Sequence, residues 1–231
     1  MHKTILIVGG SSGVGLELAR HYVAGGHRVG ITGRRDPELE GASFFPLPIG
    51  ASAEALAPAI DGVIAAFPGV QTLVYAAGFL QRGTIETLDD DALMTMSNVG
   101  LVAPMMLVSR LKPLAPTPLK VMLITSSSQY TPRAQEPAYT ATKAGLGMLG
   151  ASLARDAGIG KVLVAAPSGI STPFWNGTGE DTSTMLEPKW VADRIVDLSG
   201  GAFKYRYAKI LRNPARVEIV ETLDNDFAPV A

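Results

Sequence analysis

The sequence contains no cysteine, which excludes disulfides, thiol nucleophiles and thiolate metal sites together. It has only 3 histidines, at His2, His21 and His27, so we expect no histidine-rich metal centre. The formal net charge is −1, and the charges of both signs are interspersed. Because the chain has no basic stripe and no acidic tail, we expect no nucleic-acid partner.

Long hydrophobic runs are also lacking. The apolar segment TILIVGG near the N-terminus is shorter than the apolar region of a signal peptide, and we expect no run that approaches a membrane span. We therefore expect a cytoplasmic protein with no membrane partner. With 47% hydrophobic residues, the 231-residue chain can form one large core, and we predict a single domain over residues 1–231.

Short apolar runs alternate with longer amphipathic segments, which is typical of parallel strands joined by crossover helices. We predict an α/β fold: a Rossmann-like, doubly wound parallel sheet of about seven strands with helices on both faces. The expected strands cover residues 3–9, 27–32, 42–47, 71–77, 119–126, 161–166 and 207–212. Asp89 is expected to cap a long helix that runs toward Leu111 and is kinked at Pro104.

Residues 171–188, STPFWNGTGEDTSTMLEP, are the least regular part of the chain. Gly, Thr, Asn and Pro recur there without a period, so we predict a long loop that acts as a substrate lid. Its apolar side chains either pack the lid itself or form a pocket for a small substrate. These side chains are Phe174, Trp175, Met185 and Leu186.

A glycine-rich turn, VGGSSGVGLELAR, joins the first expected strand to a helix, with glycines at Gly9, Gly13 and Gly15. Glycine permits a tight turn and close approach of a ligand, and the free amides and positive dipole end of the helix attract a pyrophosphate. Strand, turn and amphipathic helix in this order predict dinucleotide binding. The spacing is G-x-x-x-G-x-G and not the commoner G-x-G-x-x-G.

Tyr139 and Lys143 lie four positions apart in PAYTATKAG, so on a helix they share one face. Taken alone, the pair is compatible with an ordinary helix surface. Together with the glycine spacing, however, YTATK resembles the short-chain dehydrogenase/reductase family, and the resemblance extends from the first strand to about Phe174. The active-site positions of that family fall on Asn98, Ser126, Tyr139 and Lys143. Ser127 and Ser128 are the alternatives to Ser126.

The resemblance implies that a nicotinamide dinucleotide contacts the glycine turn, the end of the fourth strand and the PSGIST segment after the sixth. The expected cofactor contacts are Gly9, Ser11, Ser12, Gly13, Val14, Gly15, Ala76, Ala77, Gly78, Tyr139, Lys143, Ile170 and Thr172. Where the family has N-N-A-G, this chain has residues 75–78, YAAG, so two bracing asparagines are missing. The aspartate that contacts adenine also has no counterpart, so we expect altered adenine packing.

The end of the second strand, VGITGRRDPELE, indicates which nicotinamide cofactor is used. An NAD enzyme generally places a carboxylate at the position of Gly33 to accept the ribose hydroxyls. Arg34 and Arg35 follow it, and a guanidinium binds a 2′-phosphate through charge-assisted hydrogen bonds. We therefore predict that NADP(H) is preferred over NAD(H), with Arg34 as the main contact and Arg35 as a secondary one. Two solvated arginines in a surface turn are the alternative.

The resemblance implies hydride transfer between NADPH and a ketone, aldehyde or secondary alcohol, with Tyr139 as general acid and base. For that role the phenol pKa must fall from about 10 toward 7, which the charge of Lys143 can help to achieve. The substrate is expected to contact Ser126, Tyr139, Phe174 and Trp175. Asn98 is expected to hold a water that links Lys143 to solvent.

Two other functions fit the same pattern. One is a regulatory protein that binds NADP(H) without turnover, and the other is an epimerase or dehydratase that uses the cofactor transiently. Members of the family commonly form dimers or tetramers through two long helices, here near residues 89–111 and 138–157, so we expect a homodimer or homotetramer. The tail at residues 216–231 lacks the usual family ending, and its role stays open.

Overall fold

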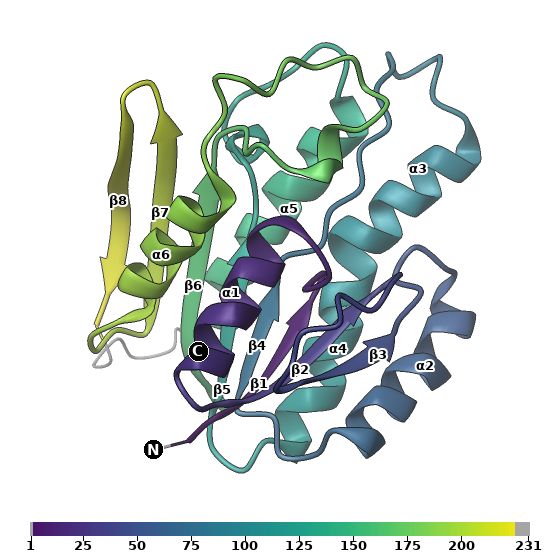
Figure 1. Cartoon of the computed structure of the whole chain (residues 1–231). Coiled ribbons are helices and arrows are strands. Elements are labelled where there is room, and N and C mark those ends of the chain that lie inside the picture. The colour runs from purple at the N-terminus through teal and green to yellow at the C-terminus, as the bar shows by residue number, and fades with distance from the viewer. Residues whose placement is uncertain (1, 225–231) are drawn as a thin grey trace.

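A computed structural model of the chain describes residues 2–224, which form one sheet between two layers of helices (Figure 1). The sheet has 8 strands in the order β3-β2-β1-β4-β5-β6-β7-β8. Strands β1 to β7 run parallel, and β8 pairs antiparallel with β7. The predicted single-domain, Rossmann-like, doubly wound α/β fold is confirmed, and the edge strand β8 adds to the strands that were expected.

All of the expected strands are present, with small shifts at their ends. The strands are β1 (Thr4–Val8), β2 (Arg28–Gly33), β3 (Ala42–Pro46), β4 (Thr72–Tyr75), β5 (Leu119–Ile124), β6 (Ile159–Pro167), β7 (Tyr205–Arg212) and β8 (Ala215–Leu223). The tail whose role was left open therefore contributes β8, while residues 225–231 lie outside the described part of the chain.

Each face of the sheet is covered by its own set of helices, and each set buries a separate hydrophobic cluster. On one face, α1 (Gly13–Ala24) and α6 (Pro188–Ser199) pack on Ile5 and Ile7 of β1. On the other face, α2 (Ala53–Ala66), α4 (Ala103–Leu111) and α5 (Pro137–Leu153) pack on Leu73 of β4 and Leu123 of β5. Because both faces are buried at the centre of the sheet, β1, β4 and β5 are almost continuously apolar, as parallel strands usually are.

The expected long helix is interrupted in its middle. Asp89 caps α3 (Asp90–Ser97), as predicted, and its carboxylate accepts a 2.7 Å hydrogen bond from the amide of Ala92. A π-helical turn, Asn98–Val102, separates α3 from α4. Pro104 lies in the first turn of α4, so the irregularity that was expected at the proline takes the form of this π-turn just before it.

The helical stretch Asp90–Leu114 is long and apolar enough to cross a membrane by length and composition. The expectation that no run approaches a membrane span was therefore wrong. In this fold, 50% of its most apolar window is buried, and Leu107 and Leu111 belong to the core beneath α4. The stretch thus serves as a core helix of the α/β layer.

Candidate active site

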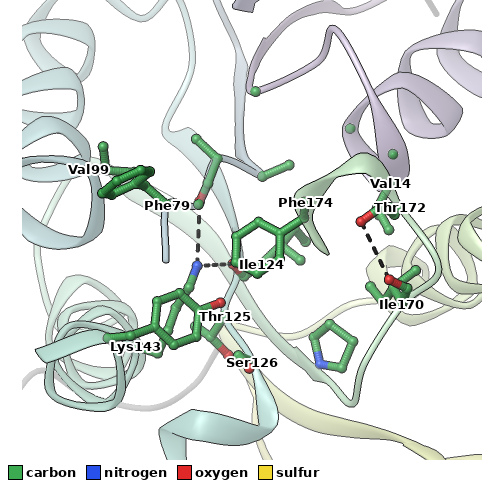
Figure 2. A pocket seen from close by; sticks show the side chains of 18 of the residues that line it. Val14, Phe79, Val99, Ile124, Thr125, Ser126, Lys143, Ile170, Thr172 and Phe174 are labelled. Atoms are coloured by element: carbon green, nitrogen blue, oxygen red, sulfur yellow. Dashed lines mark hydrogen bonds between the residues drawn. The ribbon is translucent and has the colours of Figure 1, made fainter. Parts of the chain in front are cut away.

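A cavity of about 830 Å³ opens at the carboxyl ends of the parallel strands. It lies where the sheet order reverses between β1 and β4, which is the usual ligand site of a doubly wound sheet. Residues that follow β1, β2, β3, β4, β5 and β6 all line it, and Figure 2 shows part of this lining. Its volume falls within the range of about 300–1,000 Å³ that is typical of small-molecule sites.

The glycine turn forms one wall of this cavity. Gly9 has a φ of +81°, and a Cβ atom there would lie 2.7 Å from the backbone of Ala77 at the end of β4. Ser12 is the N-cap residue of α1, but its side chain makes no capping hydrogen bond. The turn therefore packs directly against the next strand, and the first amides of α1 stay free to bind an anion.

Lys143 lies deep in the cavity, with 3% of its surface exposed. Its ammonium donates hydrogen bonds to the carbonyl oxygens of Ile124 (3.3 Å) and Ala77 (3.4 Å), drawn as dashed lines in Figure 2. Burial lowers the pKa of Lys143 to about 8. The carboxyl ends of β4 and β5 thus hold the ammonium at the floor of the cavity.

Tyr139 lies one helical turn before Lys143 on α5 and is also buried. Burial raises the pKa of its phenol, and this effect outweighs the hydrogen bond with the Ser126 side chain, which lowers it. The Lys143 ammonium lies 5.7 Å from the centre of the Tyr139 ring. The expectation that Lys143 brings the phenol pKa toward 7 is therefore not met in this structure, because desolvation of the buried phenol dominates.

Hydrogen bonding separates the three consecutive serines. The Ser126 side chain hydrogen-bonds with the Tyr139 phenol. Its hydroxyl oxygen also accepts a 3.1 Å hydrogen bond from the amide of Ser128. Ser127 instead accepts from Arg133 at 3.0 Å, and the Ser128 hydroxyl donates to Glu136 at 3.4 Å. Of the three, Ser126 is thus the one whose side chain the structure brings to Tyr139.

Asn98 is not among the residues that line the cavity. It is buried in the π-turn, and its side-chain amide donates to the carbonyl oxygen of Gly50 at 3.3 Å. Thr95 and Val99, on either side of it in the chain, line the cavity. The observed side-chain contact of Asn98 is thus with the loop after β3, and its expected link to Lys143 through a water stays a prediction.

The irregular segment 171–188 covers the cavity beside Tyr139. Phe174 packs against the Tyr139 ring at 6.0 Å and against Trp175 at 5.1 Å between ring centres. The Trp175 indole donates to the carbonyl oxygen of Ile170 at 2.9 Å. Met185 lines the cavity as well, whereas Leu186 is buried in the hydrophobic core under α6.

The far end of the cavity is formed by the ends of β2 and β3. Arg34 lines it, whereas its exposed neighbour Arg35 does not belong to the lining. A Cβ atom at Gly33 would lie 2.3 Å from the hydroxyl oxygen of Ser11, so no side chain fits there unless Ser11 moves. Residues 47–51 supply the wall after β3. The structure thus brings Arg34, Ser11 and the glycine turn together.

The remaining expected cofactor residues also lie on this cavity. The lining contains Gly9, Ser11, Ser12, Gly13, Val14, Gly15, Ala76, Ala77, Gly78, Ile170 and Thr172. In residues 2–224 we find no cluster of histidine and carboxylate side chains suited to hold a metal ion.

Sequence reasoning missed four charged residues that line the same cavity near Trp175. They are Arg82, Arg133, Glu136 and Glu180. Each stands in a loop or at a helix start with no motif around it, so the sequence carried no signal for their assembly.

Comparisons with known proteins agree with this geometry. The family model described as short chain dehydrogenase matches residues 3–183. A short chain dehydrogenase of Pseudocercospora fijiensis is 29% identical over 168 residues, which cover 67% of this chain but only 54% of that protein. The uncharacterized oxidoreductase DltE of Bacillus subtilis is 29% identical over 191 residues, covering 74% of this chain and 73% of that one. The crystal structure of BdcA in complex with NADPH is 24% identical, with a TM-score of 0.78 over 94% of this chain and 96% of that chain.

Proposed function

The chain belongs to the short-chain dehydrogenase family of NAD(P)-dependent oxidoreductases, and from that premise we propose that it is an NADPH-dependent carbonyl reductase. One observation carries this proposal: the buried phenol of Tyr139 meets the Ser126 hydroxyl in the same cavity that contains the glycine turn. The reaction we propose is the reduction of a ketone or aldehyde to an alcohol, and its reverse. A proton donor and a dinucleotide cradle are the two parts that this reaction needs.

The residues present fit a nicotinamide dinucleotide. The turn after β1 approaches Ala77 so closely that a side chain at Gly9 is excluded, and because the Ser12 side chain does not cap α1, the amides at the start of that helix are available to a phosphate. The hydroxyl of Thr32 lines the same region and has no hydrogen-bond partner among the described residues. Arg34 supplies a positive charge at the expected place of the adenosine ribose, and the fold holds NADPH in the solved BdcA complex. We therefore assign the pyrophosphate to the glycine turn and the 2′-phosphate to Arg34.

When bound, NADPH supplies the hydride, which no side chain can provide. Tyr139 gives its phenolic proton to the carbonyl oxygen of the substrate as the carbon is reduced, so one O–H bond breaks and another forms. Ser126 donates a hydrogen bond to the same oxygen and stabilises its developing negative charge. The nearby ammonium of Lys143 stabilises the phenolate that remains on Tyr139.

The segment 171–188 acts in this proposal as the substrate lid, with Phe174 and Trp175 forming the apolar side of the substrate site. We also propose assembly into a homodimer or homotetramer through the two long helices. Their surfaces carry exposed apolar side chains, Met94 and Met105 on one and Met148 on the other. Where such side chains lie together as one patch, they form an association surface.

The test is NADPH oxidation over a panel of ketones and aldehydes with the parent and Tyr139→Phe. The variant keeps the ring but loses the proton donor, so we expect turnover to fall by about 100-fold to 10,000-fold while NADPH still binds. Tyr22→Phe, which changes a buried tyrosine outside the cavity, is the matched control and should keep the parental rate. An unchanged rate in Tyr139→Phe would overturn the mechanism. Binding of NADPH with no carbonyl reduced by the parent would favour the regulatory function instead.

A further inference from the structure

Four charged side chains from three segments of the chain meet at the substrate end of the cavity. Arg82 comes from the loop after β4, Arg133 and Glu136 from the segment before α5, and Glu180 from segment 171–188. All line the cavity that contains Ser126 and Tyr139. Their ion pairs indicate that Glu136 is held in place and that Glu180 can be replaced by another carboxylate.

Glu136 is held in place by its partners. Its side chain is only 8% exposed, and its carboxylate lies 3.5 Å from the Arg82 guanidinium and 3.7 Å from that of Arg133. The Ser128 hydroxyl also donates to it, at 3.4 Å. Removing such a buried carboxylate from its partners is costly, so Glu136 stays in place and accounts for one of the two positive charges.

The exchangeable ion pair is formed by Arg82 and Glu180. Their side chains are 2.8 Å apart, and each is 34% exposed. An ion pair with this exposure contributes only about 0–1 kcal/mol to stability. Glu180 lies in the irregular segment 171–188. Its carboxylate neutralises the second positive charge of the cluster, that of Arg82. A carboxylate from a ligand could therefore replace Glu180 at little cost in stability.

The position of Arg82 relates this exchange to the chemistry. Its guanidinium lies 5.8 Å from the centre of the Trp175 ring, which packs on Phe174, which in turn packs on Tyr139. The other guanidinium, of Arg133, donates to Ser127, the residue after Ser126. The arginine pair thus borders the space in front of the proposed proton donor.

We propose that the substrate is an oxo acid, whose carboxylate binds Arg82 in place of Glu180 while its carbonyl oxygen meets Ser126 and Tyr139. This inference rests on the proposed function, because it names the class of carbonyl compound that is reduced. Arg82 suits the role because a planar guanidinium binds a carboxylate through two parallel hydrogen bonds.

The experiment compares oxo acids with their methyl esters, using acetoacetate and 4-oxopentanoate with NADPH as the reductant. We expect the parent to show a higher kcat/KM for each acid than for its ester. Arg82→Gln should lower kcat/KM for the acids by about 10-fold to 150-fold, the loss expected for a hydrogen bond to a charged group, and leave the esters little changed. Arg82→Lys should recover part of the loss, and Glu180→Gln should lower KM for the acids because the competing carboxylate is gone.

Arg212→Gln is the matched control. Arg212 also lines the cavity, at the end of β7, and it has no ion pair within residues 2–224. The ratio of kcat/KM for each acid to kcat/KM for its ester should be unchanged in this variant. Loss of the ratio in Arg212→Gln but not in Arg82→Gln would overturn the assignment.

A second readout does not require turnover. Trp175 and Trp190 are the 2 tryptophans of the chain, so Trp190→Phe leaves Trp175 as a fluorescent probe beside Arg82. We expect 4-oxopentanoate, but not its methyl ester, to change this fluorescence, and the change to disappear in Arg82→Gln. Equal reduction of acids and esters with no acid-specific fluorescence change would refute the inference while leaving the proposed function intact. An acid-specific change without any reduction would refute the proposed function and keep Arg82 as an acid-binding residue.

Discussion

The phenolic hydroxyl of Tyr75 donates a 2.5 Å hydrogen bond to the backbone carbonyl oxygen of Val99, which joins the end of β4 to the π-turn between α3 and α4. The need for this bond arises within the helix. The amide of Ala103 reaches back five residues to Asn98, and Pro104 has no N–H to offer. The carbonyl of Val99 therefore lacks a helical donor, and the fully buried Tyr75 supplies one.

Tyr75→Phe should destabilise the protein by about 1–3 kcal/mol, because it leaves the Val99 carbonyl buried without a partner. Tyr22→Phe is the control, since the Tyr22 hydroxyl contacts the sulfur of Met122, a weak acceptor at 3.6 Å, and the side chain of Ser199, so its loss leaves no backbone carbonyl without a donor. Urea unfolding of the three proteins measures both costs. If the two variants lost equal stability, the bracing role of Tyr75 would be rejected.

The sequence predicted those parts of the fold that local patterns encode. The central parallel strands β1, β2, β4, β5 and β6 are largely buried and read as apolar runs, and Asp89 stands just before a helical pattern, where a cap is expected. Strand β8 was missed for a physical reason. It is an edge strand, largely exposed, and its register with β7 shifts between Tyr207 and Ala208, which breaks the two-residue alternation near Val220.

Most of the motif residues that the sequence singled out line one cavity, because the ends of parallel strands meet at one edge of the sheet; Asn98 and Arg35 are not in this lining. It did not predict contacts between loops that are far apart in the chain. Arg82 and Glu180 are 98 positions apart, and no periodicity relates them. The role of Tyr75 was missed for a similar reason. In the sequence, a tyrosine where the family has an asparagine indicates only that the asparagine's contacts are lost, and the hydrogen bond to Val99 becomes visible in the structure alone.

Phe174→Ala should change KM and substrate preference more than stability. Phe174 is half-buried in an irregular segment, and its ring packs on Tyr139 and Trp175 and not in the main core. Phe67→Ala provides the contrast, because Phe67 is 1% exposed within the core and its truncation should cost about 3–5 kcal/mol. Thermal melts and a substrate panel for both variants make the comparison. A loss of stability in Phe174→Ala as large as that in Phe67→Ala, with unchanged preference, would identify Phe174 as a core residue.

The buried Lys143 predicts how stability depends on pH. Burial lowers its pKa from 10.5 to about 8, so below pH 8 the ammonium is charged in both the folded and the unfolded state. As the pH rises from 8 to 10.5, the folded state loses this proton first and the unfolded state binds more protons, so this residue increasingly favours folding. Between pH 8 and 10.5, the free energy of unfolding of the parent should rise by about 3 kcal/mol relative to that of Lys143→Met.

Urea unfolding at several pH values measures that difference. Lys189→Met is the control, because Lys189 is exposed and pairs with Asp193 on the surface of α6. Its difference from the parent should not grow between neutral and alkaline pH. A flat difference for Lys143→Met as well would show that the lysine titrates as it does in the unfolded chain.

Arg34→Ala should weaken NADPH much more than NADH. A 2′-phosphate carries about two negative charges near neutral pH, and a guanidinium binds it through charge-assisted hydrogen bonds, so its loss should cost about 10-fold to 150-fold in affinity for NADPH. NADH has no such phosphate, and the carboxylate that would favour it cannot stand at position 33 while Ser11 fills that space. Arg35→Ala is the matched control and should have the smaller effect, because Arg35 is exposed outside the cavity lining. Titration of both cofactors against the parent and the two variants measures this selectivity. Equal losses for the two cofactors in Arg34→Ala, or a parent that prefers NADH, would place the source of cofactor choice elsewhere in the cavity.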